Sequence, residues 1–333
     1  MPKSTPVWFL GQTVLVLALS LIHAAALPLG AFLGNALPAT TSIEQNPRGE
    51  STVISNHQNS IEETLPPGSA PDGKTEAANS KALKMLRLAL TVAGLNSLAL
   101  VLVLNHLRGS WLNVAGILWI FFFACMTFFP QSEVLFFLRN PWPILRLTVC
   151  MGVTVATLTC CFAAIFRPNR STYQNTAPSK PNWIHWRSLL LVPLYVFLYL
   201  MFGYFVAWQF ESVRQFYSGT SELLSFWSHM TSDQVLQRVL PLQLARGALW
   251  ALLMVFLARQ LTGNRTLICI CTGLAVSIWM NSQLLLPNPY MPEDVRMIHM
   301  LETASCNFLY GLLAMRILIP ADKADMPGTA VVA

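Results

Sequence analysis

The sequence has 333 residues, of which 54% are hydrophobic and only 11% charged, whereas an ordinary soluble chain carries about 25% charged residues. A water-soluble domain of this composition could not cover its own surface, which excludes the soluble globular class. The formal net charge is +6, but the 21 basic residues are spread over many short connections and no nucleic-acid-binding motif occurs. We therefore expect the lipid bilayer as the partner of this chain, and no nucleic acid.

Apolar windows long enough to cross a bilayer recur along the chain. A transmembrane helix needs about 20 mainly apolar residues, and it satisfies its own backbone polar groups, as lipid requires. We predict an all-α fold, a polytopic transmembrane helical bundle of about eight spans. The eight windows are 7–33, 86–104, 111–129, 144–166, 189–210, 239–261, 267–286 and 295–319.

The windows divide the chain into four segments. Residues 1–37 hold the first window, which is either a retained span, acting as a signal anchor, or a cleaved signal peptide. Its apolar stretch exceeds the roughly 7–15 residues of a signal peptide, which favours the retained span. Residues 38–82 are rich in Ser, Asn, Pro and Gly and predict a disordered polar loop. Residues 83–320 form a seven-span bundle, and residues 321–333 form a short tail.

Lys and Arg residues near span ends indicate membrane orientation. Each side of the predicted bundle receives ten of them, so the count alone does not decide. The short-loop cluster from Arg167 to Arg187 favours a cytoplasmic N-terminus, whereas Lys81, Lys84 and Arg87 argue for the opposite. We expect an integral protein of a plasma or inner membrane with its N-terminus in the cytoplasm.

The acidic residues gather on one side of the predicted bundle. With eight spans, the connections after the first, third, fifth and seventh share one side of the membrane. Thirteen of the fifteen Asp and Glu residues lie on or just beneath that side, because only Asp322 and Asp325 fall elsewhere. We call this side the acidic end.

Two connections have the composition of a membrane interface. Residues 181–188 combine two tryptophans with His185 and Arg187, side chains that suit the headgroup level. Residues 221–230 place five apolar side chains on one helical stripe behind a Ser or Thr cap, which predicts a short helix lying in the interface. Both patterns indicate membrane anchoring.

The most informative stretch of the sequence is 287–310, which runs from the connection after the seventh window into the eighth. Pro292 and the acidic residues after it begin a helix, since proline and carboxylates suit the first turn. His299 and Glu302 are three residues apart and therefore neighbours on one helix face, which Cys306 continues. Glu302 lies about 12–15 Å along the helix from its start, below the headgroups.

An ionisable side chain at such a depth needs a partner. Arg246, in the sixth window, lies at a comparable depth beneath the acidic end. We expect Arg246 and Glu302 to form a charge-assisted contact or to share one hydrogen-bond network. Glu133 could join them, as could the amides late in the seventh window. The predicted intramembrane polar cluster is Arg246, His299, Glu302, Cys306, Asn281 and Gln283.

Two further patterns concern packing. Glu211 and Arg214 follow the fifth window with helical spacing, and we expect a surface pair contributing at most about 1 kcal/mol. Gly247, Gly273 and Gly311 lie inside predicted spans, where small residues let helices approach closely.

Imidazole, carboxylate and thiolate groups bind zinc, but the His299 and Glu302 pair has no second histidine nearby. The chain has no HExxH, CxxC, P-loop or GxSxG motif. We therefore expect no metal and no cofactor. All seven cysteines fall inside apolar runs, so we predict no disulfide framework.

Three classes of function fit this sequence. A noncatalytic membrane protein for sensing or assembly would use the polar cluster only to fix helix packing, and the missing catalytic motifs favour this class. A transporter of a small solute or ion would use the cluster as its site. An intramembrane or lipid-modifying enzyme would use His299 and Glu302 as acid, base or ligand. The sequence assigns no catalytic residue and no oligomeric state.

Overall fold

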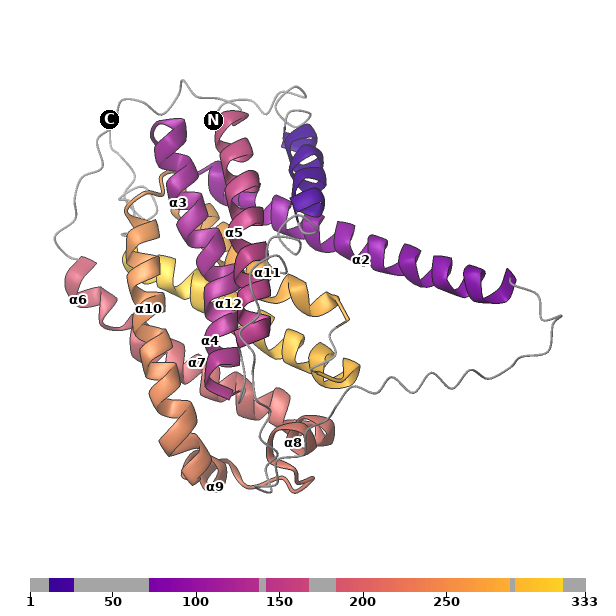
Figure 1. Ribbon diagram of the computed structural model, residues 1–333. Coiled ribbons are helices and arrows are strands. Elements are labelled where there is room, and N and C mark those ends of the chain that lie inside the picture. Colours follow the sequence, from indigo (N-terminus) through magenta and orange to yellow (C-terminus); the bar gives the residue numbers. More distant parts are fainter. Residues whose placement is uncertain (1–11, 27–71, 138–141, 168–183, 288–290, 320–333) are drawn as a thin grey trace, which may run out of the picture.

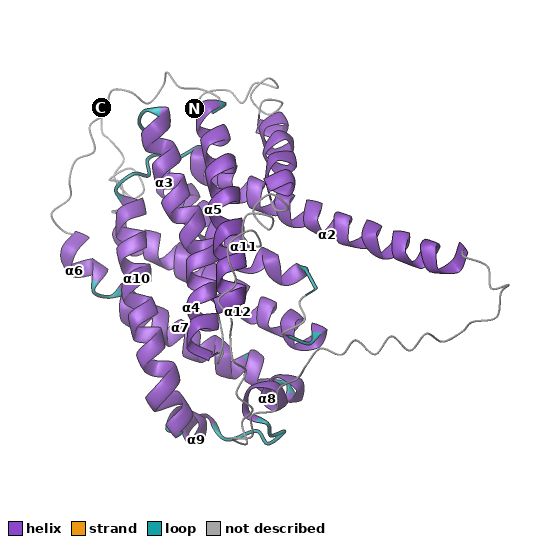
Figure 2. Ribbon diagram, in the orientation of Figure 1, coloured by secondary structure: helices purple, strands orange, loops and turns teal. Residues whose placement is uncertain are grey.

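The computed structural model describes residues 12–26, 72–137, 142–167, 184–287 and 291–319. These residues form helices joined by short connections, with no strand among them, which confirms the all-α prediction (Figure 2). After an N-terminal helix, Gln12–Ala26, the elements are α2 (Asp72–Leu104), α3 (Trp111–Phe123), η1 (Ala124–Phe128), α4 (Phe129–Phe137), α5 (Trp142–Ile165), α6 (Ile184–Ser188), α7 (Leu191–Phe205), η2 (Ala207–Gln209), α8 (Glu211–Ser218), α9 (Phe226–Met230), η3 (Val235–Val239), α10 (Leu240–Ala258), α11 (Arg265–Asn281), η4 (Ser282–Leu285) and α12 (Glu293–Leu318).

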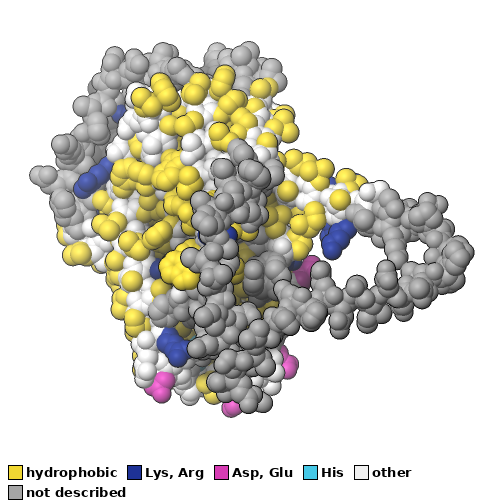
Figure 3. Space-filling model, in the orientation of Figure 1, with side chains coloured by type: hydrophobic (Ala, Val, Ile, Leu, Met, Phe, Trp, Pro, Cys, Tyr) yellow, Lys and Arg dark blue, Asp and Glu magenta, His cyan; other side chains and the backbone are white. Residues whose placement is uncertain are grey.

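Six helical segments of the described chain are long and apolar enough to cross a membrane. Their outward side chains include Leu98, Phe197 and Leu252, which are 43%, 59% and 69% exposed. Hydrophobic side chains of this kind cover much of the flank in Figure 3. The chain is therefore a multi-pass integral membrane protein. The six segments are Asn79–Leu104, Trp111–Glu133, Ile144–Ile165, Trp186–Gln209, Val235–Ala258 and Arg265–Leu285.

These six segments match the second to the seventh predicted windows, while the first and eighth windows differ from them. The described portion of the first window is the helix Gln12–Ala26, which is apolar but shorter than a span. The eighth window forms α12, a continuous helix of 26 residues. Arg296, Glu302 and Asn307 are buried on α12, and their polarity explains why this helix is less apolar than the six.

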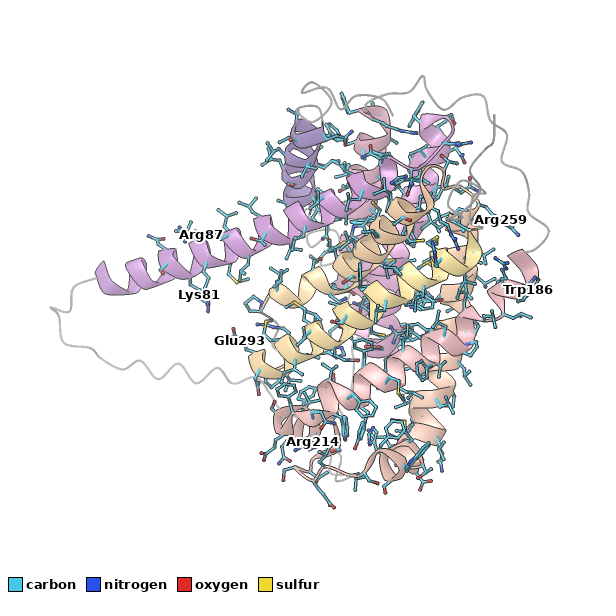
Figure 4. The ribbon with its side chains drawn as sticks, turned by 180° about the vertical axis from the view of Figure 1, so that it is seen from behind. Lys81, Arg87, Trp186, Arg214, Arg259 and Glu293 are labelled. Carbon is cyan, nitrogen blue, oxygen red and sulfur yellow. The ribbon has the colours of Figure 1, made fainter. Side chains whose placement is uncertain are left out.

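The helices form two layers that cross steeply. α2, α11, α12 and α7 lie side by side in that order, as their contacts and Figures 1 and 4 agree. α3, with α5 packed against it, and α10, which contacts α7, run across this row. The two layers enclose a core centred on large aromatic side chains, among them Trp250, Trp279 and Tyr310.

Two short connections with the same backbone course meet at the end opposite the acidic end. One joins α2 to α3 and the other joins α10 to α11. Gly109 and Gly263 both have positive φ, 110° and 124°, and each precedes a residue whose side chain caps the next helix. Leu107 and Leu261 pair as an antiparallel bridge, so the two hairpins are tied together through equivalent positions.

The close helix approach expected at glycines is confirmed. A Cβ at Gly273 on α11 would lie 2.8 Å from the Phe308 carbonyl oxygen of α12, and one at Gly311 would lie 3.0 Å from the Gly273 Cα. A Cβ at Gly247 on α10 would lie 3.1 Å from the ring of Tyr195 on α7. These glycines let two helix pairs pack backbone to backbone.

The predicted polar loop, residues 38–82, is wrong at its C-terminal boundary. Residues 72–82 belong to α2, which begins at Asp72 and continues without a break to Leu104. Figure 1 shows the N-terminal half of α2 standing clear of the bundle. The rest of that loop, the tail 321–333 and both ends of the segment 1–37 lie outside the described residues.

The structure has a short helix in each described interfacial segment. Of residues 181–188, the described portion is α6. In 221–230, helix α9 begins only after Ser225, whose side chain accepts a hydrogen bond from the Ser228 N–H. The α9 segment is held at the bundle because the Tyr204 hydroxyl donates to the Leu224 carbonyl at 2.8 Å. His229 packs 4.6 Å from the Trp208 ring, and its burial lowers the pKa of the imidazole.

Among the described residues, the segments that follow the fifth window and begin the eighth lie together at the acidic end. α8 contacts α12, and Val213 packs with Val295 and Ala207 in a small apolar cluster there. Figure 3 shows Asp and Glu side chains along the lower edge of the molecule, the edge that carries α8 and α9 in Figure 1.

Candidate functional site

Arg246 is the charged side chain that α10 supplies to the predicted cluster. It is 3% exposed and forms an ion pair with Glu133 of α4. It also donates to Gln243 Oε1 at 3.4 Å and to the Phe129 carbonyl oxygen at 3.5 Å. One guanidinium therefore ties α10 to the end of the third span.

The direct contact predicted between Arg246 and Glu302 is wrong, although their helices touch and Cys306 lies within electrostatic range of both side chains. Among the described residues, Glu133 is the carboxylate that pairs with Arg246, and Glu302 pairs instead with His299 on its own helix. A π-helical turn, η1, lies just before α4, which carries Glu133. The wider turn rotates the side chains that follow it around the helix axis, which uniform α-helical spacing does not predict.

His299, Glu302, Asn281 and Thr303 form a second polar group between α11 and α12. His299 Nδ1 and Glu302 Oε2 lie 3.0 Å apart, with the Glu302 side chain 4% and the His299 side chain 20% exposed. The Thr303 hydroxyl donates to Asn281 Oδ1, and the Ser277 hydroxyl donates to the Ala304 carbonyl oxygen at 2.8 Å. These hydrogen bonds fix α12 against α11 at the depth of the Glu302 carboxylate.

α7 carries the side chains that lie between the two groups. The Tyr195 hydroxyl donates to Gln243 Oε1 at 3.1 Å, beside Arg246. One turn further along α7, Tyr199 lies within electrostatic range of Glu133, Arg246 and Glu302. A Cβ at Gly203, the next turn, would lie 4.0 Å from Glu302 Oε1. Tyr195, Tyr199 and Gly203 therefore follow one face of α7. This face lies between the Arg246–Glu133 pair and the Glu302–His299 pair.

The remaining predicted members differ in position. Cys306 is 3% exposed and lies within electrostatic range of both Glu302 and Arg246, so it belongs to the cluster. Gln283 lies in η4 and makes no side-chain hydrogen bond to the cluster among the described residues. The structure thus brings together five of the six predicted residues, and whether they act as a site stays a prediction.

The sequence interpretation missed Tyr195, Tyr199 and Gln243. In a window as apolar as 189–210, tyrosines resemble ordinary aromatic packing, which gives no reason to choose them. Gln243 carried a usable signal, because it lies three residues before Arg246 on the same helix face.

Arg214 is another correction. It is 8% exposed and donates to the carbonyl oxygens of Ser221, Trp208 and Gln209 at 2.8, 2.8 and 2.9 Å. Glu211 is exposed and is not its ion-pair partner in the described stretches of the chain. The expected surface pair is therefore wrong, because the unpaired carbonyls after α7 attract this guanidinium more closely than a solvated carboxylate does.

Within the described residues, no three His, Cys, Asp or Glu side chains lie where they could together hold a metal ion. The seven cysteines are free thiols, buried or half-buried. Comparison with known protein families, with curated proteins and with solved structures finds no match for this chain.

Proposed function

We propose that the chain is a noncatalytic multi-pass membrane protein for sensing or assembly, whose polar cluster fixes the packing of its helices. The observation that carries this proposal is the ion pair of Arg246 with Glu133. It joins α10 to the third span while the same guanidinium bonds the Phe129 carbonyl oxygen. The charge of this guanidinium is balanced by a carboxylate of the protein, which is what a packing role requires.

The second polar group supports the same interpretation. The Glu302 carboxylate is paired with His299, and the Thr303 hydroxyl joins Asn281 across the α11–α12 contact. That contact is also the place where Gly273 meets Gly311. Polar bonds beside a close glycine contact are a common way to fix two membrane helices. A cytoplasmic N-terminus is supported by the basic cluster of the connection after the fourth window. A plasma or inner membrane remains part of the proposal.

The test replaces the Arg246–Glu133 pair by apolar residues. Arg246→Met or Glu133→Leu alone should lower the free energy of unfolding by about 2–4 kcal/mol, because each leaves one charge without its partner. The double variant should recover most of that loss, since apolar side chains of similar size can replace a buried ion pair. Melting temperatures of the purified proteins in nanodiscs give the comparison, with Arg238→Met, an exposed arginine of η3, as control.

Function is then measured in cells that lack the native gene. At matched membrane levels, the double variant should restore any phenotype that the deletion causes. A double variant that is stable and inserted but restores nothing would contradict the noncatalytic proposal. It would favour transport or chemistry at these charges instead.

A further inference from the structure

A cavity of about 670 Å³ opens at the acidic end, between the N-terminal half of α2 and the start of α12. α8 contributes Phe216 to its wall, and η4 contributes Leu285. The candidate spans in α2 and α11 have their acidic-end limits at Asn79 and Leu285. The cavity therefore lies at the level where a bilayer changes from headgroups to acyl chains.

Arg296 gives this cavity a buried positive charge. It lines the cavity and is only 5% exposed. One guanidinium nitrogen donates to the Leu286 carbonyl oxygen at 2.6 Å, while Nε has no hydrogen-bond partner. Arg296 is in no ion pair with a carboxylate of the described residues. Since a buried cation without a counter-charge is costly, an anion in the cavity would stabilise Arg296, which differs from the other carbonyl-bound arginines in lining this cavity.

The other lining residues define what kind of anion fits. Lys84 of α2 adds a second cation, and Glu293 of α12 adds one carboxylate, so the three ionisable side chains carry one net positive charge. Leu88, Phe216 and Met297 make much of the remaining wall apolar. A single negative charge joined to a hydrocarbon chain matches this lining.

We propose that the cavity binds an anionic phospholipid. Its phosphodiester contacts Arg296 and Lys84, and an acyl chain lies against Leu88 and Met297. Phosphatidylcholine has the same phosphodiester, but its choline would place a third cation beside these two. The anionic phospholipid satisfies the free Nε–H of Arg296 and matches the net charge of the lining. A free phosphate ion carries more negative charge and would leave the apolar wall in water. The lipid also fills the angle between α2 and α12, so it stabilises the half of α2 that stands clear of the bundle.

The experiment compares the full-length protein in nanodiscs of phosphatidylcholine alone and of phosphatidylcholine with phosphatidylglycerol. Phosphatidylglycerol should raise the melting temperature, and native mass spectrometry should detect a retained anionic lipid. Arg296→Gln and Lys84→Gln should each weaken lipid retention about tenfold, as expected for a lost charge-assisted contact. Arg87→Gln is the matched control, because this exposed arginine of α2 does not line the cavity. Figure 4 shows Arg87 on the side of α2 opposite to Lys81 and Glu293.

Arg296→Gln also removes the hydrogen bond to the Leu286 carbonyl oxygen, and this variant could fail to fold for that reason alone. In that case the test rests on Lys84→Gln, because Lys84 is exposed. Lys84→Gln with undiminished lipid retention would overturn the proposal. An equal loss in Arg87→Gln would also overturn it, because the effect would then be general surface attraction. Inorganic phosphate added to phosphatidylcholine nanodiscs should give no rise in melting temperature. A rise as large as that from phosphatidylglycerol would assign the cavity to a soluble anion.

Discussion

Arginine side chains at both ends of the bundle donate to backbone carbonyl oxygens where helices end or are interrupted. Carbonyl groups near helix ends have fewer partners within the helix than those in its middle, which makes them good acceptors for these arginines. These guanidinium groups bind carbonyl oxygens of the protein and not only lipid headgroups. For this reason the number of basic residues on each side does not indicate the membrane orientation of the chain. The donors and their acceptors are Arg167 to Leu107, Arg187 to Ile317, Arg214 to Ser221, Arg246 to Phe129, Arg265 to Arg316 and Arg296 to Leu286.

The candidate site could be predicted only incompletely at this scale. Burial of Arg246 and Glu302 follows from their places in apolar windows, and so does their need for partners. The choice of partner does not follow, because Glu133 and Glu302 lie beneath the same end at similar depth. The π-helical turn before α4 changes the direction of the side chains that follow it. Pro130, which comes just after that turn and lacks a backbone N–H, is its signal in the sequence, but this signal does not choose the partner.

Glycine substitutions test the close contact between α11 and α12. Gly273→Ala should lower the free energy of unfolding by about 1–3 kcal/mol, because the new methyl group would meet the Phe308 carbonyl oxygen. Gly116→Ala is the matched control on α3, where no atom lies within 4 Å of the added Cβ. That variant should change the free energy by no more than about 1 kcal/mol. Equal melting temperatures for the two variants would show that the helices are not packed this closely.

At the scale of elements, four interruptions of regular helix gather toward the acidic end. η1 and η3 are π-helical turns, and η2 and η4 are 3₁₀ turns. They leave carbonyl groups for Arg214, Arg246 and Arg296 to bind. The apolar windows predicted the spans well, because span length and hydrophobicity are set locally. The early start of α2 was missed although Ala, Lys and Glu, all good helix formers, are frequent in residues 74–84.

Arg214 tests whether these bonds hold the acidic-end connections. Arg214→Gln removes the charge that three carbonyl groups share, so α8 and the segment after it should open more often. Hydrogen exchange of the backbone amides in residues 207–225 should become at least about tenfold faster. Arg238→Gln, an exposed arginine at the same end, should leave those rates unchanged. Identical exchange in both variants would rule out this role for Arg214.

At the scale of the whole molecule, the alternating direction of successive long helices sets the positions of the other features. It brings the ends of α4, α7 and α11 and the starts of α10 and α12 to one side, where the polar cluster and the cavity lie. It also brings the α2–α3 and α10–α11 connections together on the other side, where Leu107 pairs with Leu261. The order of the spans predicted this division, whereas the steep crossing of the two layers depends on side-chain packing between distant segments.

Labelling with a membrane-impermeant maleimide tests this division most directly. Single cysteines replace the exposed residues Glu222, Glu293, Ser110 and Asn264, and each variant is labelled in sealed vesicles. The chain without an added cysteine measures the labelling of the seven native cysteines. Cysteines at Glu222 and Glu293 should react from one side, and those at Ser110 and Asn264 from the other. Reaction of the Glu222 and Glu293 positions from opposite sides would contradict the alternate crossing on which the polar cluster and the lipid site depend.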